Sequence, residues 1–268
     1  MLAALGLGLA ACAGAARGSP AAPAPTPEPK ALTVLAAASL TDAFTELGDD
    51  FSRQPGNAGV AMTFGFGAST QLRTQLEQGA PADVFAPADM AQMDLAVRAG
   101  LIQGTPQVFA RNRLVVVVPR HNRAGVETLA DLARPGLKLV TTPREVPIGA
   151  YTRQALERMA ADPQHGAGFD QKVLANVVSE EANVRQVVTK VQLGEADAAV
   201  VYLSDVTPKV APDVRTLDIP DRFNVLAAYP IAVTRHARAP ARAQGFVEYV
   251  LSPAGRATLT RHNFVPGE

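Results

Sequence analysis

This chain of 268 residues has very little cysteine, no tryptophan and no net charge at neutral pH. Tryptophan is absent, and Cys12 is the single cysteine, so a disulfide within one chain is excluded. The 25 basic residues balance the 25 acidic ones, so no overall field attracts nucleic acid or an acidic membrane surface. If the protein binds an anion, local hydrogen bonds must hold it.

Spacing patterns for metal binding and catalysis are also missing. The four histidines lie far apart, at positions 121, 165, 236 and 262, and form no His-x-x-x-His pattern. No Gly-x-Ser-x-Gly segment is present to carry a nucleophile. We therefore expect no direct metal ligands, no cofactor and no enzymatic activity.

The N-terminus begins with a short apolar run, MLAALGLGLAACAG. Its apolar core of about ten residues is too short to span a bilayer and is typical of a signal peptide. The run ends in Leu9-Ala10-Ala11-Cys12, which resembles the lipobox of bacterial lipoproteins, in which the cysteine carries the lipid. An ordinary cleaved signal peptide with a chance cysteine is the alternative, because no Lys or Arg precedes the run.

Residues 13–30 are rich in alanine and proline and show no apolar periodicity. Such a composition is typical of an extended, semi-rigid spacer. With residues 1–12 as the signal peptide, it predicts a protein of the cell envelope. We expect it in the periplasm or on the outer face of the cytoplasmic membrane, held there by a lipid on Cys12.

The segment Leu32–Gln54 changes from a strand pattern to a helix pattern at Ser39. Apolar, partly β-branched residues fill positions 32–35, and apolar residues then recur at helical spacing, at 40, 44, 47 and 51. Ser39 therefore lies at a helix start, where free backbone N–H groups can bind an anion. The alternative is a simple capping box, completed by Asp42 three residues later.

Three later segments also lead from a turn into a helix start. In the first, small residues precede Ser69 and Thr70, whose hydroxyls face the start of a helix. In the second, Pro147 and Gly149 open a turn that leaves the amide of Ile148 without an intrahelical partner. The third is the helix that starts at Val184. These starts supply further donors for one ligand.

Strand and helix patterns alternate along the rest of the chain. The run Leu114–Val118 is apolar on both faces and predicts a buried strand of a mostly parallel sheet. Tyr202 ends another buried strand, where its phenol reaches the crevice at the carboxyl end, although a core position with a backbone-bonded hydroxyl is the alternative. Asp83 and Asp89 are expected to cap helices or form turns. The whole pattern predicts an α/β fold.

Neutral donors at helix starts suit a compact oxyanion. They supply directed hydrogen bonds without the desolvation cost of burying charged side chains. Each bond to a charged partner contributes about 1.5–3 kcal/mol, so a handful of them reaches micromolar or tighter binding.

Six motifs, in the same order, resemble the periplasmic molybdate-binding proteins of the ATP-driven molybdate transporters. They are AAASLTDAF (36–44), GAPADVFAPAD (79–89), NRLVVVVP (112–119), PREVPIGAY (143–151), EEANVRQVV (180–188) and AVVYLSD (199–205). The resemblance extends from about Leu32 to the C-terminus, which is all of the chain outside the leader and spacer.

The resemblance implies a type II periplasmic-binding-protein fold, with two α/β lobes, a ligand cleft between them and a two-segment hinge. Lobe 1 would comprise residues 31–112 and 230–268, and lobe 2 residues 113–229. The protein would capture molybdate or tungstate and deliver it to the membrane permease of an ABC transporter; we expect a monomer. The family's ligand groups correspond here to the hydroxyls of Ser39, Ser69 and Tyr202 and the amides of Ile148 and Val184. Because Gly67-Ala68-Ser69-Thr70 replaces the usual run of serines, Thr70 is the alternative second hydroxyl.

Two other functions remain open from the sequence. The same cleft could hold sulfate, phosphate or a small organic anion; an organic acid would need an arginine such as Arg144 or Arg185, which we interpret instead as surface charges. An enzyme on the same two-lobed frame is the second alternative, and the missing nucleophile and base argue against it.

Overall fold

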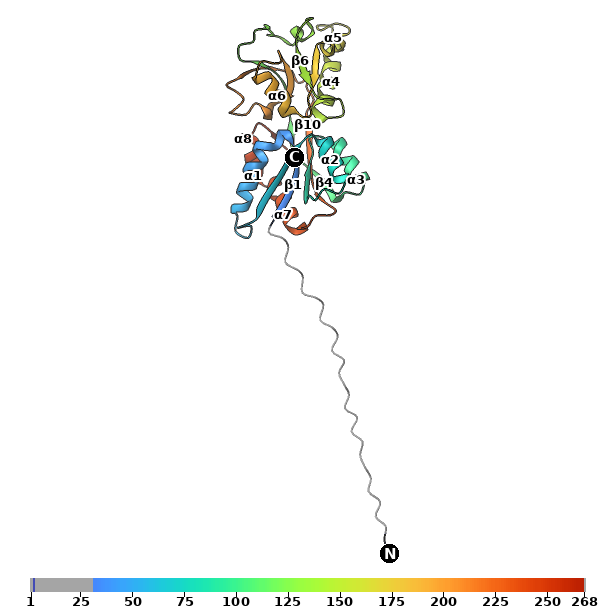
Figure 1. Cartoon of the computed structure of the whole chain (residues 1–268), viewed down its shortest axis with the longest axis vertical. Helices are drawn as coiled ribbons and strands as arrows, with labels where there is room; N and C mark the ends of the chain where they lie inside the picture. The colour runs from blue at the N-terminus through green and yellow to red at the C-terminus, as the bar shows by residue number, and fades with distance from the viewer. Residues whose placement is uncertain (1, 3–30, 268) are drawn as a thin grey trace.

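The computed structural model describes residue 2 and residues 31–267. The predicted lipid-bearing Cys12 and the spacer of residues 13–30 lie outside the described residues, as does the signal peptide apart from its second residue. The described chain folds into two lobes, drawn one above the other in Figure 1. Among the described residues, no helix combines the length and the apolar content needed to cross a membrane.

Lobe 1 is built on a six-stranded sheet with the order β11-β4-β10-β3-β1-β2. β1 pairs in parallel with β2 and β3, whereas β10 runs antiparallel to β3 and β4. The strands are β1 (Ala31–Ala37), β2 (Ala61–Gly67), β3 (Val84–Ala86), β4 (Ile102–Asn112), β10 (Ala227–Thr234) and β11 (Val265–Pro266). The parallel edge brings the carboxyl ends of β1 and β2, and so the turns that follow them, to one end of the sheet.

Helices cover both faces of this sheet. They are α1 (Thr41–Arg53), α2 (Ser69–Glu77), α3 (Met90–Arg98), α7 (Pro240–Leu251) and α8 (Pro253–Arg261). On one face, Phe44 of α1 packs its ring against Phe109 and Phe246 at centroid distances of 5.5 and 6.0 Å. On the other face, leucines of α2 and Met93 of α3 pack on Phe85 of β3. These aromatic and aliphatic contacts hold the ends of the strands in place.

Lobe 2 contains two smaller sheets, one of order β8-β5-β9 and one of order β6-β7. Its strands are β5 (Leu114–Pro119), β6 (Leu139–Thr141), β7 (Val177–Glu180), β8 (Ala199–Tyr202) and β9 (Val214–Asp218). Its helices are α4 (Pro147–Ala160), α5 (Phe169–Ala175) and α6 (Val184–Gln192), with the 3-10 turns η2 (Leu129–Ala133) and η3 (Leu203–Asp205). In Figure 1 this lobe carries the labels α4, α5, α6 and β6.

The prediction that β5 lies in a mostly parallel sheet is wrong. β5 pairs antiparallel with both of its neighbours, β8 and β9. Its five apolar residues are all buried, as predicted. A continuous apolar run reports that both faces of a strand are covered, and it does not report the direction of the neighbouring strands.

Two segments cross between the lobes. Arg113 alone separates β4 of lobe 1 from β5 of lobe 2, and residues 219–226 lead from β9 back to β10. Asn224 ties the two crossings together, because its Oδ1 accepts from the N–H of Leu114 (2.9 Å) and its Nδ2 donates to the carbonyl of Leu114 (2.8 Å). β10 begins at Ala227, so the predicted boundary between residues 229 and 230 falls inside this strand.

The strands β4, β9 and β11 and the helix α5 were missed by the sequence patterns. β4 is long and has Gly104 and Pro106 in its exposed first half, which hides the alternation of its buried end. The predicted cap of α3 is confirmed, since Asp89 accepts from the N–H of Gln92 at 2.8 Å. Asp83 also plays a structural part, accepting from the backbone N–H groups of Thr33 and Arg238.

Candidate ligand-binding site

A small cavity, lined mostly by buried residues, lies where four helix starts from the two lobes meet. Ser39, Ser69, Ile148, Val184 and Tyr202, the five predicted ligand residues, all line it. The cavity is small: about 20 Å³ is accessible to the centre of a water molecule. A single water needs about 10–15 Å³ on this measure, so the cavity suits one compact ligand. Its remaining lining is small or apolar: Ala37, Ala38, Gly67, Ala68, Ala88, Val146, Pro147 and Asn183.

Ser39 lies in a 3-10 turn, η1 (Ala38–Leu40), between β1 and α1. Its side chain is buried, and its Oγ lies 2.9 Å from the hydroxyl oxygen of Tyr229 on β10. The alternative capping role of Asp42 is wrong: the residue before α1 is Leu40, and no side chain caps that helix. Ser39 is therefore free of local capping and faces the cavity.

Ser69 is the first residue of α2 and follows directly on the turn after β2. Its Oγ accepts from the N–H of Ala88, the residue next to the cap of α3, at 2.9 Å. With that lone pair occupied, the Ser69 proton is available to a ligand. Thr70 follows on the same helix and does not line the cavity, so Ser69 is the better of the two candidates.

The amides of Ile148 and Val184 belong to the first turns of α4 and α6. Pro147 occupies the first position of α4, and Val146 before it has no side chain that can cap. At α6, Asn183 caps the N–H groups of Arg185 and Gln186 (3.0 and 3.3 Å), which leaves the Val184 amide uncapped. First-turn amides have no partner within their own helix, so both are donors for a ligand in the cavity.

Gly149 explains how α4 approaches the cavity so closely. A Cβ on this residue would collide with the backbone oxygens of Thr142 and Pro143. The sequence-based reading gave Gly149 an open turn, whereas the structure places it inside α4, packed against the segment after β6. The absence of a side chain therefore positions the Ile148 amide.

Tyr202 ends β8 with its side chain buried. Its hydroxyl is buried and has no hydrogen-bond partner among the described residues. The alternative of a backbone-satisfied core tyrosine is therefore wrong. Burial raises the pKa of Tyr202 well above its usual range, so the phenol stays protonated and remains a donor. A buried hydroxyl without a partner costs about 1–3 kcal/mol, so this donor is open to a ligand in the cavity.

Arg185 is not the surface charge that the sequence-based interpretation made it. Its Nη2 lies 2.7 Å from Asp42 Oδ2 of lobe 1, and its Nε lies 3.2 Å from Asp205 Oδ1 and 3.3 Å from the Ala38 carbonyl. Its side chain is 26% exposed and joins the two lobes next to the cavity. Arg144, in contrast, is exposed and does not line the cavity.

Asp205 is a further residue that the sequence reasoning missed. Its side chain is fully buried in η3, where its Oδ2 accepts from the N–H of Tyr202 at 3.2 Å. Burial raises the pKa of Asp205 to about 6, and the neighbouring Arg185 opposes this shift. In the sequence, the contact between Tyr202 and Asp205 is signalled only by the position of Asp205, three residues after the end of β8.

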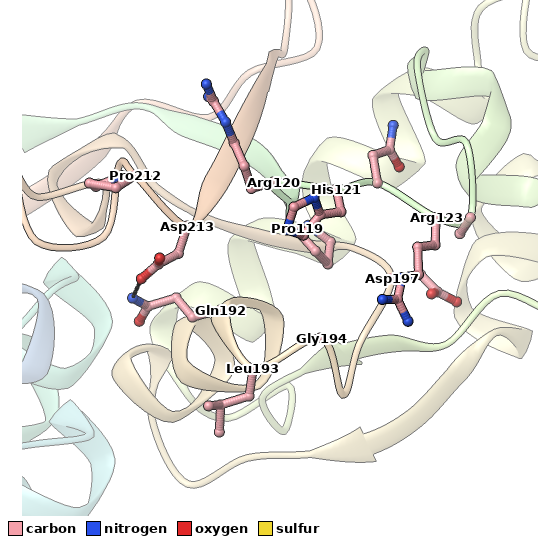
Figure 2. Close-up of a pocket in the computed structure, with 12 residues that line it drawn as sticks. Pro119, Arg120, His121, Arg123, Gln192, Leu193, Gly194, Asp197, Pro212 and Asp213 are labelled. Carbon is pink, nitrogen blue, oxygen red and sulfur yellow. Dashed lines mark hydrogen bonds between the residues drawn. The ribbon is translucent and has the colours of Figure 1, made fainter.

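A larger cavity, of about 360 Å³, opens elsewhere in lobe 2, between the end of β5 and the end of α6. Figure 2 shows its lining, with Gln192 hydrogen-bonded to Asp213 at 2.9 Å. Its charged groups come from surface loops, and it contains none of the buried side-chain atoms that lack partners. The smaller interlobe cavity is therefore the better ligand site. In the described part of the chain no group of residues has the makeup of a metal site.

Two α/β lobes, two crossing segments and a small interlobe cavity lined with donors define a binding protein of the type II periplasmic class. The family model for bacterial extracellular solute-binding proteins matches residues 32–265. The chain belongs to this family, and its curated relatives are named as binding proteins, not as enzymes.

Named relatives agree with this assignment. The chain is 41% identical to the molybdate-binding protein ModA of Mycobacterium tuberculosis, over 88% of this chain and 84% of that protein. It is 32% identical to the molybdate-binding protein ModA of Escherichia coli, over 87% and 88% of the two chains. The solved structure of the periplasmic molybdate-binding protein of Azotobacter vinelandii matches with a TM-score of 0.76 at 21% identity, over 88% of this chain and all of that one.

Proposed function

We propose that this protein captures molybdate or tungstate outside the cytoplasmic membrane and delivers it to the permease of an ABC transporter. One observation carries the proposal: three hydroxyls and two helix-start amides from both lobes surround one small cavity, and the Tyr202 hydroxyl there has no protein partner. A ligand with several acceptor oxygens and no protons satisfies all of these donors at once.

The relatives support the choice of ligand. Two proteins that match nearly the whole described chain, at 41% and 32% identity, are named for molybdate. A tetrahedral oxyanion can accept hydrogen bonds from all five donors of this chain. Each bond to a charged acceptor contributes about 1.5–3 kcal/mol. Because the donors come from both lobes, the ligand favours the closed state, and closure presents the permease with a different surface from the open state.

Isothermal titration calorimetry with molybdate, tungstate, sulfate and phosphate tests the proposal. We expect heat with the first two anions and much weaker binding of the others. The absence of heat with both molybdate and tungstate would refute the proposed ligand. Molybdate and tungstate are nearly equal in size, so we expect them to bind with similar affinity.

The role of Ser39 has its own test. Ser39→Ala removes one charge-assisted hydrogen bond, so we expect the dissociation constant for molybdate to rise by roughly one to two orders of magnitude. Thr70→Val is the matched control, because Thr70 lies beside the site without lining the cavity. An unchanged affinity in Ser39→Ala would remove Ser39 from the ligand set.

The attachment to the envelope is a separate part of the proposal. We propose that residues 1–12 are a signal peptide, that Cys12 carries a lipid, and that residues 13–30 hold a monomeric binding domain away from the membrane. Mass spectrometry of the protein from membranes should show a lipid on Cys12, and Cys12→Ser should release the protein into the soluble fraction. Soluble wild-type protein without a lipid would favour an ordinary cleaved signal peptide.

A further inference from the structure

A chain of four buried polar side chains lies behind the cavity and runs across the hinge. Asn112 Nδ2, at the end of β4, lies 2.8 Å from Ser204 Oγ of η3 and 3.5 Å from the hydroxyl oxygen of Tyr229. Tyr229, on β10, in turn lies 2.9 Å from Ser39 Oγ at the cavity. All four side chains are buried. The donor in each of these hydrogen bonds decides whether Ser39 presents its proton or its lone pairs to a ligand.

The amide of Asn112 sets the direction of these hydrogen bonds. Its nitrogen can only donate, so the long 3.5 Å contact favours the Tyr229 oxygen as an acceptor, and the Tyr229 proton then turns to another acceptor. Among the described residues, the acceptor within reach of that proton is Ser39 Oγ, 2.9 Å from the Tyr229 oxygen. Burial keeps the pKa of Tyr229 well above its usual range, so this proton is always present. In this arrangement Tyr229 donates to Ser39, which leaves the Ser39 proton for the cavity.

The opposite amide orientation is less favourable. It would turn the two donors of the Asn112 amide toward the position that its Oδ1 occupies here, where the described residues offer no partner. A buried donor without a partner is rarer in proteins than an under-satisfied carbonyl oxygen. In that arrangement Tyr229 would donate to Asn112, and Ser39 would donate to Tyr229 and turn its lone pairs to the ligand.

Ser69 reaches the same state through an unrelated contact. Its Oγ accepts from the backbone N–H of Ala88 at 2.9 Å, and a backbone N–H can only donate. With Tyr229 as the donor to Ser39, both serine hydroxyls of the cavity accept one hydrogen bond from behind. The same polarity at two sites on different elements indicates that the cavity is arranged to present protons.

We propose that Tyr229 is a positioning residue for ligand binding, which donates to Ser39 Oγ and so directs the Ser39 proton toward the bound oxyanion. Asn112 acts one step earlier, by keeping the Tyr229 oxygen an acceptor. The proposal rests on the proposed function, since it assigns the polarity of the same site. It adds two residues that do not line the cavity.

A double-mutant cycle tests the proposal. Isothermal titration calorimetry with molybdate is carried out on the wild type, Tyr229→Phe, Ser39→Ala and the double variant, with thermal unfolding to verify that each is folded. We expect Tyr229→Phe to weaken binding about three- to tenfold, because the Ser39 hydroxyl loses its polarising and orienting donor. In the Ser39→Ala background, Tyr229→Phe should change the affinity less than about twofold. Tyr249→Phe, on α7 away from the cavity, is the matched control and should bind like the wild type.

Two results would overturn the proposal. Unchanged or tighter binding by Tyr229→Phe would show that Ser39 donates to Tyr229 in the wild type. Additive losses in the double variant would show that Tyr229 supports the structure without acting through Ser39. If the wild type gives no heat with molybdate or tungstate but binds sulfate or phosphate, the proposed function fails, and the same cycle with the bound anion still decides the role of Tyr229. A wild type that binds none of the four anions refutes both.

Discussion

Replacing Tyr202 by phenylalanine should change stability and binding in opposite directions. The hydroxyl of Tyr202 is buried at the cavity and has no partner among the described residues. Its ring packs edge-on against Tyr151 and Tyr229, with centroid distances of 6.5 and 5.7 Å. Phenylalanine keeps these ring contacts and removes only the oxygen, so the effect of the hydroxyl is isolated.

The expected magnitudes follow from that environment. A buried polar group without a partner costs about 1–3 kcal/mol, so the ligand-free variant should be more stable than the wild type by an amount in this range. A water molecule in the cavity would partner the hydroxyl and bring the gain toward the lower end. The bound state loses a hydrogen bond to an anion, about 1.5–3 kcal/mol, which weakens binding by roughly one to two orders of magnitude.

Two measurements on the same protein check this prediction. Urea unfolding without anion gives the change in the free energy of unfolding, and calorimetric titration with molybdate gives the change in affinity. Tyr249→Phe provides the control for a tyrosine outside the cavity. A ligand-free Tyr202→Phe that is less stable than the wild type, or one that binds molybdate equally well, would contradict the assignment of this hydroxyl as an unsatisfied ligand donor.

Three further predictions concern groups around the cavity. Arg185→Gln leaves Asp205 buried without its cation, so the free energy of unfolding should fall by about 2–4 kcal/mol at neutral pH. Small-angle scattering should show a more open molecule, and unchanged stability would contradict a role between the lobes. Burial raises the pKa of Asp205 from 3.8 to about 6, so its protonation stabilises the native state fully below about pH 4 and this contribution is lost as the pH rises through about 6. Between about pH 4 and pH 7, urea titrations should show the free energy of unfolding of the wild type falling by about 2 kcal/mol relative to that of Asp205→Asn. Asp89, which is similarly buried, contributes equally to both proteins. Parallel stability curves would refute this prediction. Gly149→Ala places a Cβ against the carbonyl of Pro143, which should destabilise the protein by about 1–3 kcal/mol and weaken molybdate binding, and a calorimetric titration equal to that of the wild type would count against it.

The four helix starts were predictable because each depends on local sequence. Ser39, Ser69, Ile148 and Val184 each follow a turn and precede apolar residues at helical spacing, and these signals determine where a helix begins. Their convergence in one cavity was predicted from the resemblance of ordered motifs, since no local pattern states which helix starts meet. Their role as ligand donors stays a prediction until binding is measured.

The residues that the sequence could not assign act across long separations. Arg185 lies 143 positions from Asp42, and Tyr229 lies 190 positions from Ser39. Periodicity and spacing describe the neighbourhood of a residue on its own element, so a charge at a helix start looks solvated until the facing lobe is known. The direction of β5 failed for the same reason, because its partners β8 and β9 come about 80 to 100 residues later in the chain.

The proposed ligand is a doubly negative ion, so the charges around the cavity matter. Arg185 joins the lobes beside the cavity, but Asp42 and Asp205 both contact it, so this cluster carries no net positive charge at neutral pH. The helix starts supply what the cluster does not: each helix N-terminus carries about half a positive charge, and those of α1, α2, α4 and α6 together approach about two. That total matches a tetrahedral dianion. We therefore expect the ion pairs of Arg185 to hold the lobes together and the helix starts to supply the field for the proposed anion.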